Sequence, residues 1–269
     1  MYPVLFKIFG ITIDTYSVIW FIALSLAIVW CIKRLDLYGL DEYESRRVMS
    51  VSFFCMLLGA VMFKKLYYLR YISYFIAHPS LLLQFKSWGL SEFGAVMGAF
   101  ISALVMCVIS RKVSFLRLCD AATPPAMLAI AVGRWGCFFH GCCSGLPTKC
   151  FTAVHFPLDR AGFTRHPTQI YYSVIAAVSV MILLYAEKRV IPLQKKHSRY
   201  YSVIAPLGMI LYALMRFAVA PFREWSSLTS MIMRWHRPNT YFSLAVIFPI
   251  LCAWLAYSLI KLKYDGQDK

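Results

Sequence analysis

Long apolar runs separated by short polar and basic segments make up most of this chain. A helix needs roughly 20 apolar residues to cross a hydrocarbon core about 30 Å thick. Seven runs approach that length, at about 16–32, 49–62, 93–109, 119–139, 169–186, 202–220 and 241–260. The runs are continuously apolar, which is typical of membrane helices, whereas barrel strands alternate. The pattern predicts an all-α polytopic membrane protein with about seven transmembrane helices, forming a single membrane domain over residues 1–269.

Two segments between the runs differ from ordinary loops. Residues 71–90 are aromatic and apolar but too short to cross, which predicts a re-entrant or interfacial segment. Residues 141–168 are rich in glycine and proline and predict an irregular segment outside the membrane.

Charge changes the picture in two ways. The chain is 60% hydrophobic with a formal charge of +16, but its basic residues lie mostly in short loops. Attraction to anionic lipid headgroups explains this better than nucleic-acid binding, so we expect no nucleic-acid partner. Basic clusters also follow the first, third, fifth and seventh runs. The positive-inside rule then places the C-terminus in the cytoplasm and the N-terminus outside.

Arg134 is the first candidate functional residue, because it lies near the end of the fourth apolar run. A charge at membrane depth costs several kcal/mol, so it indicates a partner or a ligand. Asp120 lies 14 residues earlier, about 21 Å along a helix, too far to pair with it. The glycines at positions 133, 136, 141 and 145 let backbone approach a ligand and predict a break in the helix where that ligand would lie. The sequence favours an anion site here over a structural ion pair.

Arg216 is the second intramembrane arginine. At helical spacing Tyr212, Arg216 and Arg223 share one face. Guanidinium groups form paired hydrogen bonds to phosphate oxygens, so this face suits a phosphate. The alternative is an interfacial arginine whose charge reaches the headgroups.

A cluster of sulfur and imidazole groups follows Arg134, namely Cys137, His140, Cys142, Cys143 and Cys150. The Cys137–His140 spacing is found among zinc ligands, but adjacent Cys142 and Cys143 do not easily turn to one tetrahedral centre. We therefore predict no metal ion and no cofactor, and interpret the cysteines as small packing residues. Two alternatives stay open, namely a disulfide involving Cys150 if this loop is extracytoplasmic, and a metal or redox protein that uses the Cys/His cluster.

A second polar cluster, Arg165–Tyr171, begins the fifth span. Pro167 fits the first turn of a helix, and Thr168 and Gln169 can cap its free backbone donors. The functional alternative is that Arg165 and His166 line the same outer cavity as Arg134.

Several of these stretches together resemble one family. Residues 133–145, read as GRWGCFFHGCCSG, are similar to the GR-x-G-C-F-x-x-G-C-C-x-G motif of prolipoprotein diacylglyceryl transferases. Residues 165–171 resemble that family's RHP-T/S-Q-L/I-Y motif, and residues 212–216 its Tyr-x-x-x-Arg. Residues 120–124 are similar to its D-x-x-A-P motif, and Tyr16 falls at its Trp-Tyr-Gly. The resemblance covers nearly the whole chain.

The resemblance implies a bacterial inner-membrane enzyme. It would transfer the diacylglyceryl group of phosphatidylglycerol to the lipobox cysteine thiol in the signal peptide of a preprolipoprotein, releasing glycerol phosphate. Arg134 and Arg216 would hold the lipid phosphate and stabilise its charge as it leaves. The substrate-binding set would comprise Arg134, Tyr16, Tyr212, Arg216, Arg165, Gln169 and Gly136.

The chain departs from the family pattern at residues that would assist the thiol. The family's histidine or tyrosine falls at Phe93, and the glutamate after the late arginine falls at Ala220. A glutamate after HPTQLY falls at Tyr172, and an arginine usual in the second span falls at Val61. His140, His166 or Glu92 would have to replace them, and His140 and His166 join the two arginines as catalytic candidates. The alternative is a paralogue that retains a phospholipid pocket without, or with altered, transfer activity.

Overall fold

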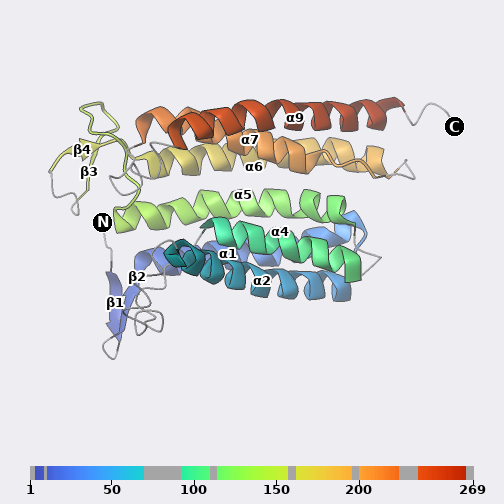
Figure 1. Ribbon diagram of the computed structural model, residues 1–269, viewed down its shortest axis with the longest axis horizontal. Coiled ribbons are helices and arrows are strands. Elements are labelled where there is room, and N and C mark those ends of the chain that lie inside the picture. The colour runs from blue at the N-terminus through green and yellow to red at the C-terminus, as the bar shows by residue number, and fades with distance from the viewer. Residues whose placement is uncertain are drawn as a thin grey trace. The chain divides into compact units, whose positions relative to one another are not determined.

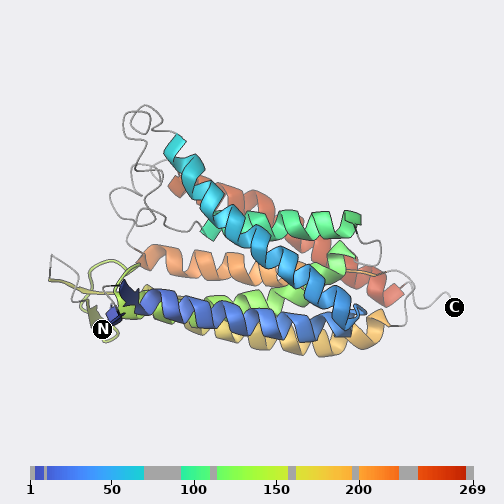
Figure 2. The ribbon, with the colours of Figure 1, turned by 90° about the horizontal axis from the view of Figure 1, so that it is seen from below.

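Seven α-helices dominate the computed structural model, which describes residues 4–8, 11–69, 92–109, 114–156, 162–195, 200–223 and 236–264 (Figures 1 and 2). Each predicted span corresponds to one of them. Their bounds are α1 Thr15–Leu35, α2 Glu42–Leu69, α4 Glu92–Ile109, α5 Phe115–His140, α6 Thr168–Gln194, α7 Ile204–Val219 and α9 His236–Tyr264. The predicted helical membrane architecture is confirmed.

Four helical segments in the described part of the chain are long and apolar enough to cross a membrane. They are Thr15–Tyr38, Phe115–His140, Thr168–Gln194 and Ile204–Phe222, and a shorter apolar segment covers Met97–Ile109. The segment at 71–90, predicted to be re-entrant or interfacial, lies outside the described residues.

α2 begins at Glu42, whereas the apolar pattern predicted that the second helix begins near residue 49. The Asp41 carboxylate accepts the backbone N–H of Glu44 at 2.8 Å, which caps the helix start. Glu42 and Glu44 then place negative charge in the first turn, where the helix dipole favours it. The capping residue, rather than hydrophobicity, therefore sets this boundary.

Short strands that the apolar pattern does not show precede α1 and lie between α5 and α6. β1 Val4–Ile8 pairs antiparallel with β2 Ile11–Asp14 ahead of α1. β3 Val154–His155 pairs with β4 Thr164–Arg165 inside the segment predicted to be irregular.

The chain divides into two compact units, residues 32–118 and residues 1–31 with 119–269. In the first unit α2 packs against α4. A side chain at Gly98 of α4 would overlap the Cys55 backbone carbonyl of α2, so glycine permits this close approach. That the whole chain forms one membrane domain stays a prediction.

The second unit contains the main hydrophobic core. α6 packs against α7, and α7 packs against α9 (Figure 1). The buried core side chains come from α5, α6 and α7 and are Met127, Ala131, Tyr172, Ala176, Val180, Leu183, Ile204, Met215 and Val219. A side chain at Gly208 of α7 would overlap the Thr123 methyl group of α5, so these two helices also approach closely.

The Asp120 carboxylate joins α5 to the start of α7. It is fully buried and accepts hydrogen bonds from the Ser202 hydroxyl at 2.6 Å and the Tyr200 hydroxyl at 2.7 Å. It also accepts the backbone N–H groups of Val203 at 3.2 Å and Ala205 at 2.8 Å. These bonds satisfy the open donors at the start of α7, a role that a residue on the same helix usually takes.

Replacing Asp120 with alanine is therefore expected to lower the free energy of unfolding by roughly 3 kcal/mol or more. Several buried donors would lose their acceptor, at about 1–3 kcal/mol each. Denaturant unfolding in mild detergent measures the change, with exposed Asp36→Ala as the control. Equal stabilities of the two variants would contradict this role of Asp120.

Candidate functional site

Most of the predicted site residues lie at one end of the second unit, which we call the loop end. The loop end comprises the starts of α1 and α6, the ends of α5 and α7, and the β3–β4 segment (Figure 1). The Tyr16 ring at the start of α1 contacts the His140 ring at the end of α5, with centroids 6.0 Å apart. Asp120 lies at the other end of α5, which confirms that it is not the partner of Arg134.

The helix carrying Arg134 is continuous through Gly133 and Gly136, so the predicted break is wrong at both glycines. A Cβ on Gly133 would lie 2.8 Å from the Trp20 indole, and one on Gly136 would lie 3.2 Å from the Tyr16 carbonyl oxygen. Both glycines therefore let α5 pack closely against α1. Gly136, predicted to bind substrate, supports the site through this packing.

The predicted break is confirmed at Gly141, where α5 has ended and the φ of 81° is left-handed. The N–H groups of Gly141 and Cys142 both donate to the Cys137 carbonyl oxygen, at 3.0 and 3.1 Å. This is the usual way in which glycine closes a helix C-terminus. Cys143 is also left-handed, at φ 63°, which is uncommon for a residue with a side chain. The two residues turn the chain back toward the last turn of α5.

Arg134 and Arg216 face the same aromatic ring. The Arg134 guanidinium carbon lies 4.7 Å from the centroid of the Tyr172 ring, and that of Arg216 lies 5.8 Å from it. Arg134 is 7% exposed and Tyr172 3% exposed, whereas Arg216 is half-buried. The fold thus brings together two cations that are 82 positions apart in the sequence (216 minus 134).

Sequence reasoning missed Tyr172 as a member of the site and noted it only as a departure from the family pattern. Its ring attracts both guanidinium groups through its negative face, at about 0.5–2 kcal/mol per contact. The only sequence signal was its place three residues after Gln169, on the same face of α6.

The face predicted for Tyr212, Arg216 and Arg223 is wrong for Arg223. α7 ends at Val219, a 3₁₀ turn follows at Ala220–Phe222, and Arg223 is extended. Pro221 lies in that turn and does not continue the α-helix. Tyr212 is on α7 and 41% exposed, and its predicted contact with substrate stays a prediction.

Thr168 and Gln169 hold the chain after α5 rather than capping α6. The Thr168 hydroxyl donates to the Cys143 carbonyl oxygen at 2.7 Å, and the Gln169 amide donates to the Cys142 carbonyl oxygen at 2.6 Å. No side-chain cap is present at the start of α6, where Pro167 is the N-cap. The predicted capping role is therefore wrong for both residues.

Gln169 also offers an acceptor to a ligand. Its side chain is 1% exposed, and within the described residues its Oε1 atom is buried without a hydrogen-bond partner. The same holds for the Nδ1 atom of His140. Buried polar atoms are nearly always paired, so each of these two atoms is a candidate to bind a ligand group.

Arg165 is buried and donates to the Gly145 carbonyl oxygen at 3.3 Å. Gly145 is enclosed, since any side chain there would overlap the Phe222 carbonyl. Arg165 thus holds the loop segment in place, and its predicted contact with substrate stays a prediction.

His166 belongs to a small polar cluster beside this loop. Its Nδ1 atom lies 3.1 Å from the Tyr171 hydroxyl and 3.8 Å from the Cys150 sulfur. The Thr152 hydroxyl lies 3.0 Å from that sulfur and 2.8 Å from the Tyr171 hydroxyl. Hydrogen bonds to the thiolate from Thr152 first, and then Thr148, lower the pKa of Cys150 below its usual value.

Cys150 is therefore expected to react with iodoacetamide at a lower pH than an ordinary thiol, because the thiolate is the reactive form. Thr152→Val removes the main donor and should raise the pH midpoint of alkylation, whereas Ser144→Ala should leave it unchanged. Mass spectrometry of the alkylated Cys150 peptide measures the midpoint. An unchanged midpoint in Thr152→Val would contradict the assigned cause.

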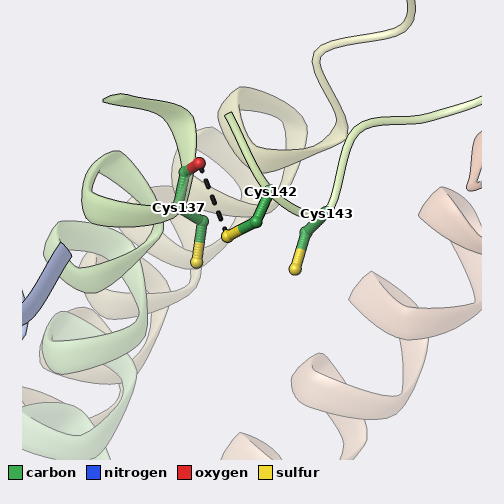
Figure 3. A group of neighbouring side chains, drawn as sticks. All are labelled: Cys137, Cys142 and Cys143. Carbon is green, nitrogen blue, oxygen red and sulfur yellow. Dashed lines mark hydrogen bonds between the residues drawn. The ribbon is translucent and has the colours of Figure 1, made fainter. Parts of the chain in front are cut away.

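Three further thiols meet at the end of α5. The sulfur atoms of Cys137, Cys142 and Cys143 all lie within 4.8 Å of one another (Figure 3). The expectation that Cys142 and Cys143 do not easily turn to one tetrahedral centre is thus wrong, because the left-handed Cys143 redirects its side chain. Hydrogen bonds from Cys137 and Cys142, with the charges of Arg223 and Arg134, lower the pKa of Cys143. The hydrogen bonds to Cys137 and Cys143 raise the pKa of Cys142.

Comparison with known proteins assigns the family. The sequence model of the prolipoprotein diacylglyceryl transferase family matches residues 3–257. The chain belongs to this family.

Curated relatives agree with the assignment. The chain is 33% identical over 230 residues to the phosphatidylglycerol–prolipoprotein diacylglyceryl transferase of Clostridium novyi, covering 83% of this chain and 84% of the relative. It is 25% identical over 264 residues to the transferase of that name from Finegoldia magna, covering 98% and 96%. It is 26% identical over 263 residues to that of Pseudomonas syringae, covering 95% and 93%.

The departures from the transferase family pattern fall in different parts of the structure. Tyr172 lies between the two arginines, and Ala220 begins the 3₁₀ turn after α7. Phe93 and Glu92 lie in the first turn of α4, in the other unit, and Val61 lies in α2.

Proposed function

We propose that this transferase moves the diacylglyceryl group of phosphatidylglycerol to the lipobox cysteine of a preprolipoprotein signal peptide. The observation that carries the proposal is the pair of guanidinium groups on the Tyr172 ring, at the ends of membrane-spanning helices. The thiol sulfur attacks the glyceryl carbon, a carbon–sulfur bond forms, and the carbon–oxygen bond to phosphate breaks. The electron pair of that bond leaves with glycerol phosphate, which gains one negative charge.

Arg134 and Arg216 act on the group whose charge grows in this step. Each can donate two hydrogen bonds to phosphate oxygens. Preorganised donors in a site sheltered from water stabilise a developing anion more than they stabilise the bound substrate. The Tyr172 ring carries no formal charge, so it orients both cations without cancelling their attraction for the phosphate.

The remaining residues supply shape and polarity around the lipid. The buried Oε1 atom of Gln169 is available to accept a headgroup hydroxyl. Tyr16 and Tyr212 line the pocket from α1 and α7. Arg165 assists by holding the loop at Gly145.

His140 and His166 are the candidates for accepting the thiol proton. His140 has a buried Nδ1 atom without a hydrogen-bond partner in the described ranges. The Nδ1 atom of His166 lies near Tyr171 and Cys150. An available ring nitrogen favours His140, since a general base must reach the proton that it removes.

The enzyme would lie in the bacterial inner membrane with the loop end on the outer side. Lys33 and Arg34 lie in the last turn of α1, and Lys261 and Lys263 in the last turn of α9. Basic residues at helix ends favour the cytoplasmic side. This supports an external N-terminus and a cytoplasmic C-terminus.

Transfer is tested with the purified full chain in vesicles that contain phosphatidylglycerol with a labelled diacylglyceryl group. Label should appear on a lipobox peptide, with release of glycerol phosphate, and a peptide with serine in place of the lipobox cysteine should gain none. Label remaining wholly in lipid would contradict the proposal.

The second candidate is a paralogue that binds the lipid without transfer, favoured by Phe93 and Ala220 at the family's histidine and glutamate positions. It predicts headgroup-dependent vesicle binding, no labelled peptide and no complementation of a strain depleted of the authentic enzyme.

A further inference from the structure

The three thiols at the end of α5 take no part in the function proposed above, yet they are arranged as a ligand set. We infer that Cys137, Cys142 and Cys143 bind one thiophilic metal ion of the Zn²⁺ class, which takes the substrate thiol as a fourth ligand. The role toward substrate rests on the proposed function, whereas metal binding itself does not.

The distances between the sulfur atoms fit one metal centre. Zinc–sulfur bonds of about 2.3 Å place neighbouring sulfurs about 4 Å apart in a trigonal or tetrahedral site. The three sulfur atoms already lie within 4.8 Å of one another. The difference between 4.8 Å and about 4 Å is below about 1 Å. Small side-chain movements would therefore bring the three sulfur atoms to the separations of a zinc site.

The backbone that carries the thiols is held in this arrangement. Gly141 and Cys143 are both left-handed, a conformation that is unfavourable for Cys143 because it carries a side chain. Thr168 and Gln169 fix the carbonyl groups of Cys143 and Cys142. Strained backbone that the surrounding structure holds in place is often found in ligand-binding segments.

Access and charge also suit a metal ion. Cys137 is buried and Cys143 is exposed, so an ion can enter from the loop side. Three thiolates with a divalent cation carry a net charge of −1, and the guanidinium groups of Arg134 and Arg223 attract the Cys143 thiolate. Thiolate ligands select Zn²⁺, Cu⁺ and similar ions over Mg²⁺ or Ca²⁺.

Three protein ligands leave one position of a tetrahedral zinc site for an external ligand, as in catalytic zinc sites. A thiol that coordinates such an ion loses its proton. The proton passes to His140, the favoured base of the proposed function, and the metal-bound sulfur supplies the electron pair for the new carbon–sulfur bond. Cys137 lies one helical turn after Arg134, so the activated thiol and the phosphate site are adjacent. Metal coordination would thereby replace the assistance lost with the histidine and glutamate of the family pattern.

Metal content of the purified, reduced full-length protein tests binding without reference to activity. We expect one Zn²⁺ per chain after equilibration with Zn²⁺ and removal of excess ion. Cys137→Ser and Cys143→Ala should each lose at least nine-tenths of it, whereas Cys119→Ser, at the other end of α5, should keep it. Cys143 is exposed, so its variant separates loss of the metal from loss of the fold. The proposal would be overturned if the wild-type protein held no more zinc than the Cys137 and Cys143 variants. A disulfide between two of the three cysteines under these reducing conditions would also overturn it.

Cobalt substitution then tests the fourth position. Co²⁺ bound to the triad should give visible absorption bands that shift when a lipobox peptide is added, and that do not shift with the serine peptide. Bands without a peptide-dependent shift would overturn the role toward substrate. If the bands shift but no diacylglyceryl transfer occurs with Zn²⁺ restored, the metal site stands and the proposed function fails.

Discussion

Replacing Arg134 with glutamine is expected to lower kcat for diacylglyceryl transfer by about 100- to 1000-fold, the usual effect of losing one preorganised donor to a developing anion. Arg134 is the more buried of the two arginines, so its guanidinium group interacts with phosphate where water screens least. The measurement is the rate of label transfer to a lipobox peptide at saturating phosphatidylglycerol.

Arg189→Gln is the matched control. Arg189 also lies over a tyrosine ring of α6, at 5.3 Å from the Tyr185 centroid, but that ring is exposed. This variant should transfer at the wild-type rate, and both variants should show wild-type thermal stability. An Arg134→Gln enzyme that is folded and turns over normally would remove Arg134 from the mechanism.

Replacing Tyr172 with leucine is expected to reduce kcat/KM by about 10- to 100-fold, because both arginines lose the ring that orients them. Two cation–π contacts at about 0.5–2 kcal/mol each correspond together to about 5- to 900-fold, and the expected loss is the middle of that range. Tyr172→Phe keeps the aromatic face and should stay within about threefold of wild type. Tyr185→Leu removes the corresponding ring beneath Arg189 and should have no effect.

A double variant separates positioning from packing. If Tyr172 acts through the arginines, the effects of Tyr172→Leu and Arg216→Gln should be less than additive, since residues in contact share one interaction energy. Additive losses would indicate that the tyrosine supports only the α6 core.

Sequence patterns predicted the helices well and singled out the two cations, because both signals are strong in a membrane chain. An uncharged apolar run of about 20 residues has few stable states other than a spanning helix. Arg134 and Arg216 stand out for the same reason, as charges that the apolar surroundings penalise. The sequence also predicted that Asp120 lies too far along the fourth run to pair with Arg134, and the contacts of Asp120 at the other end of α5 agree with this.

The features that the sequence did not predict depend on where side chains point in the folded protein, which composition and spacing do not determine. Tyr172 looks like one more aromatic residue in an apolar run, and only the packing of α5, α6 and α7 shows that two guanidinium groups face it. Gly133 and Gly136 face α1 inside a regular helix, which sequence cannot distinguish from a break. The convergence of Cys142 and Cys143 depends on one positive φ angle, at a residue type that seldom adopts it.

The contacts of Asp120 have a consequence for how the chain can change in length. Asp120 fixes the start of α7 against the start of α5, and Arg216 lies near the far end of that same α7. The spacing of the two cations therefore depends on the number of residues between 120 and 134. One residue inserted there would turn Arg134 by about 100° around the helix axis and move it by about 1.5 Å along it. Homologues should accept insertions freely in their loops and reject them in this segment.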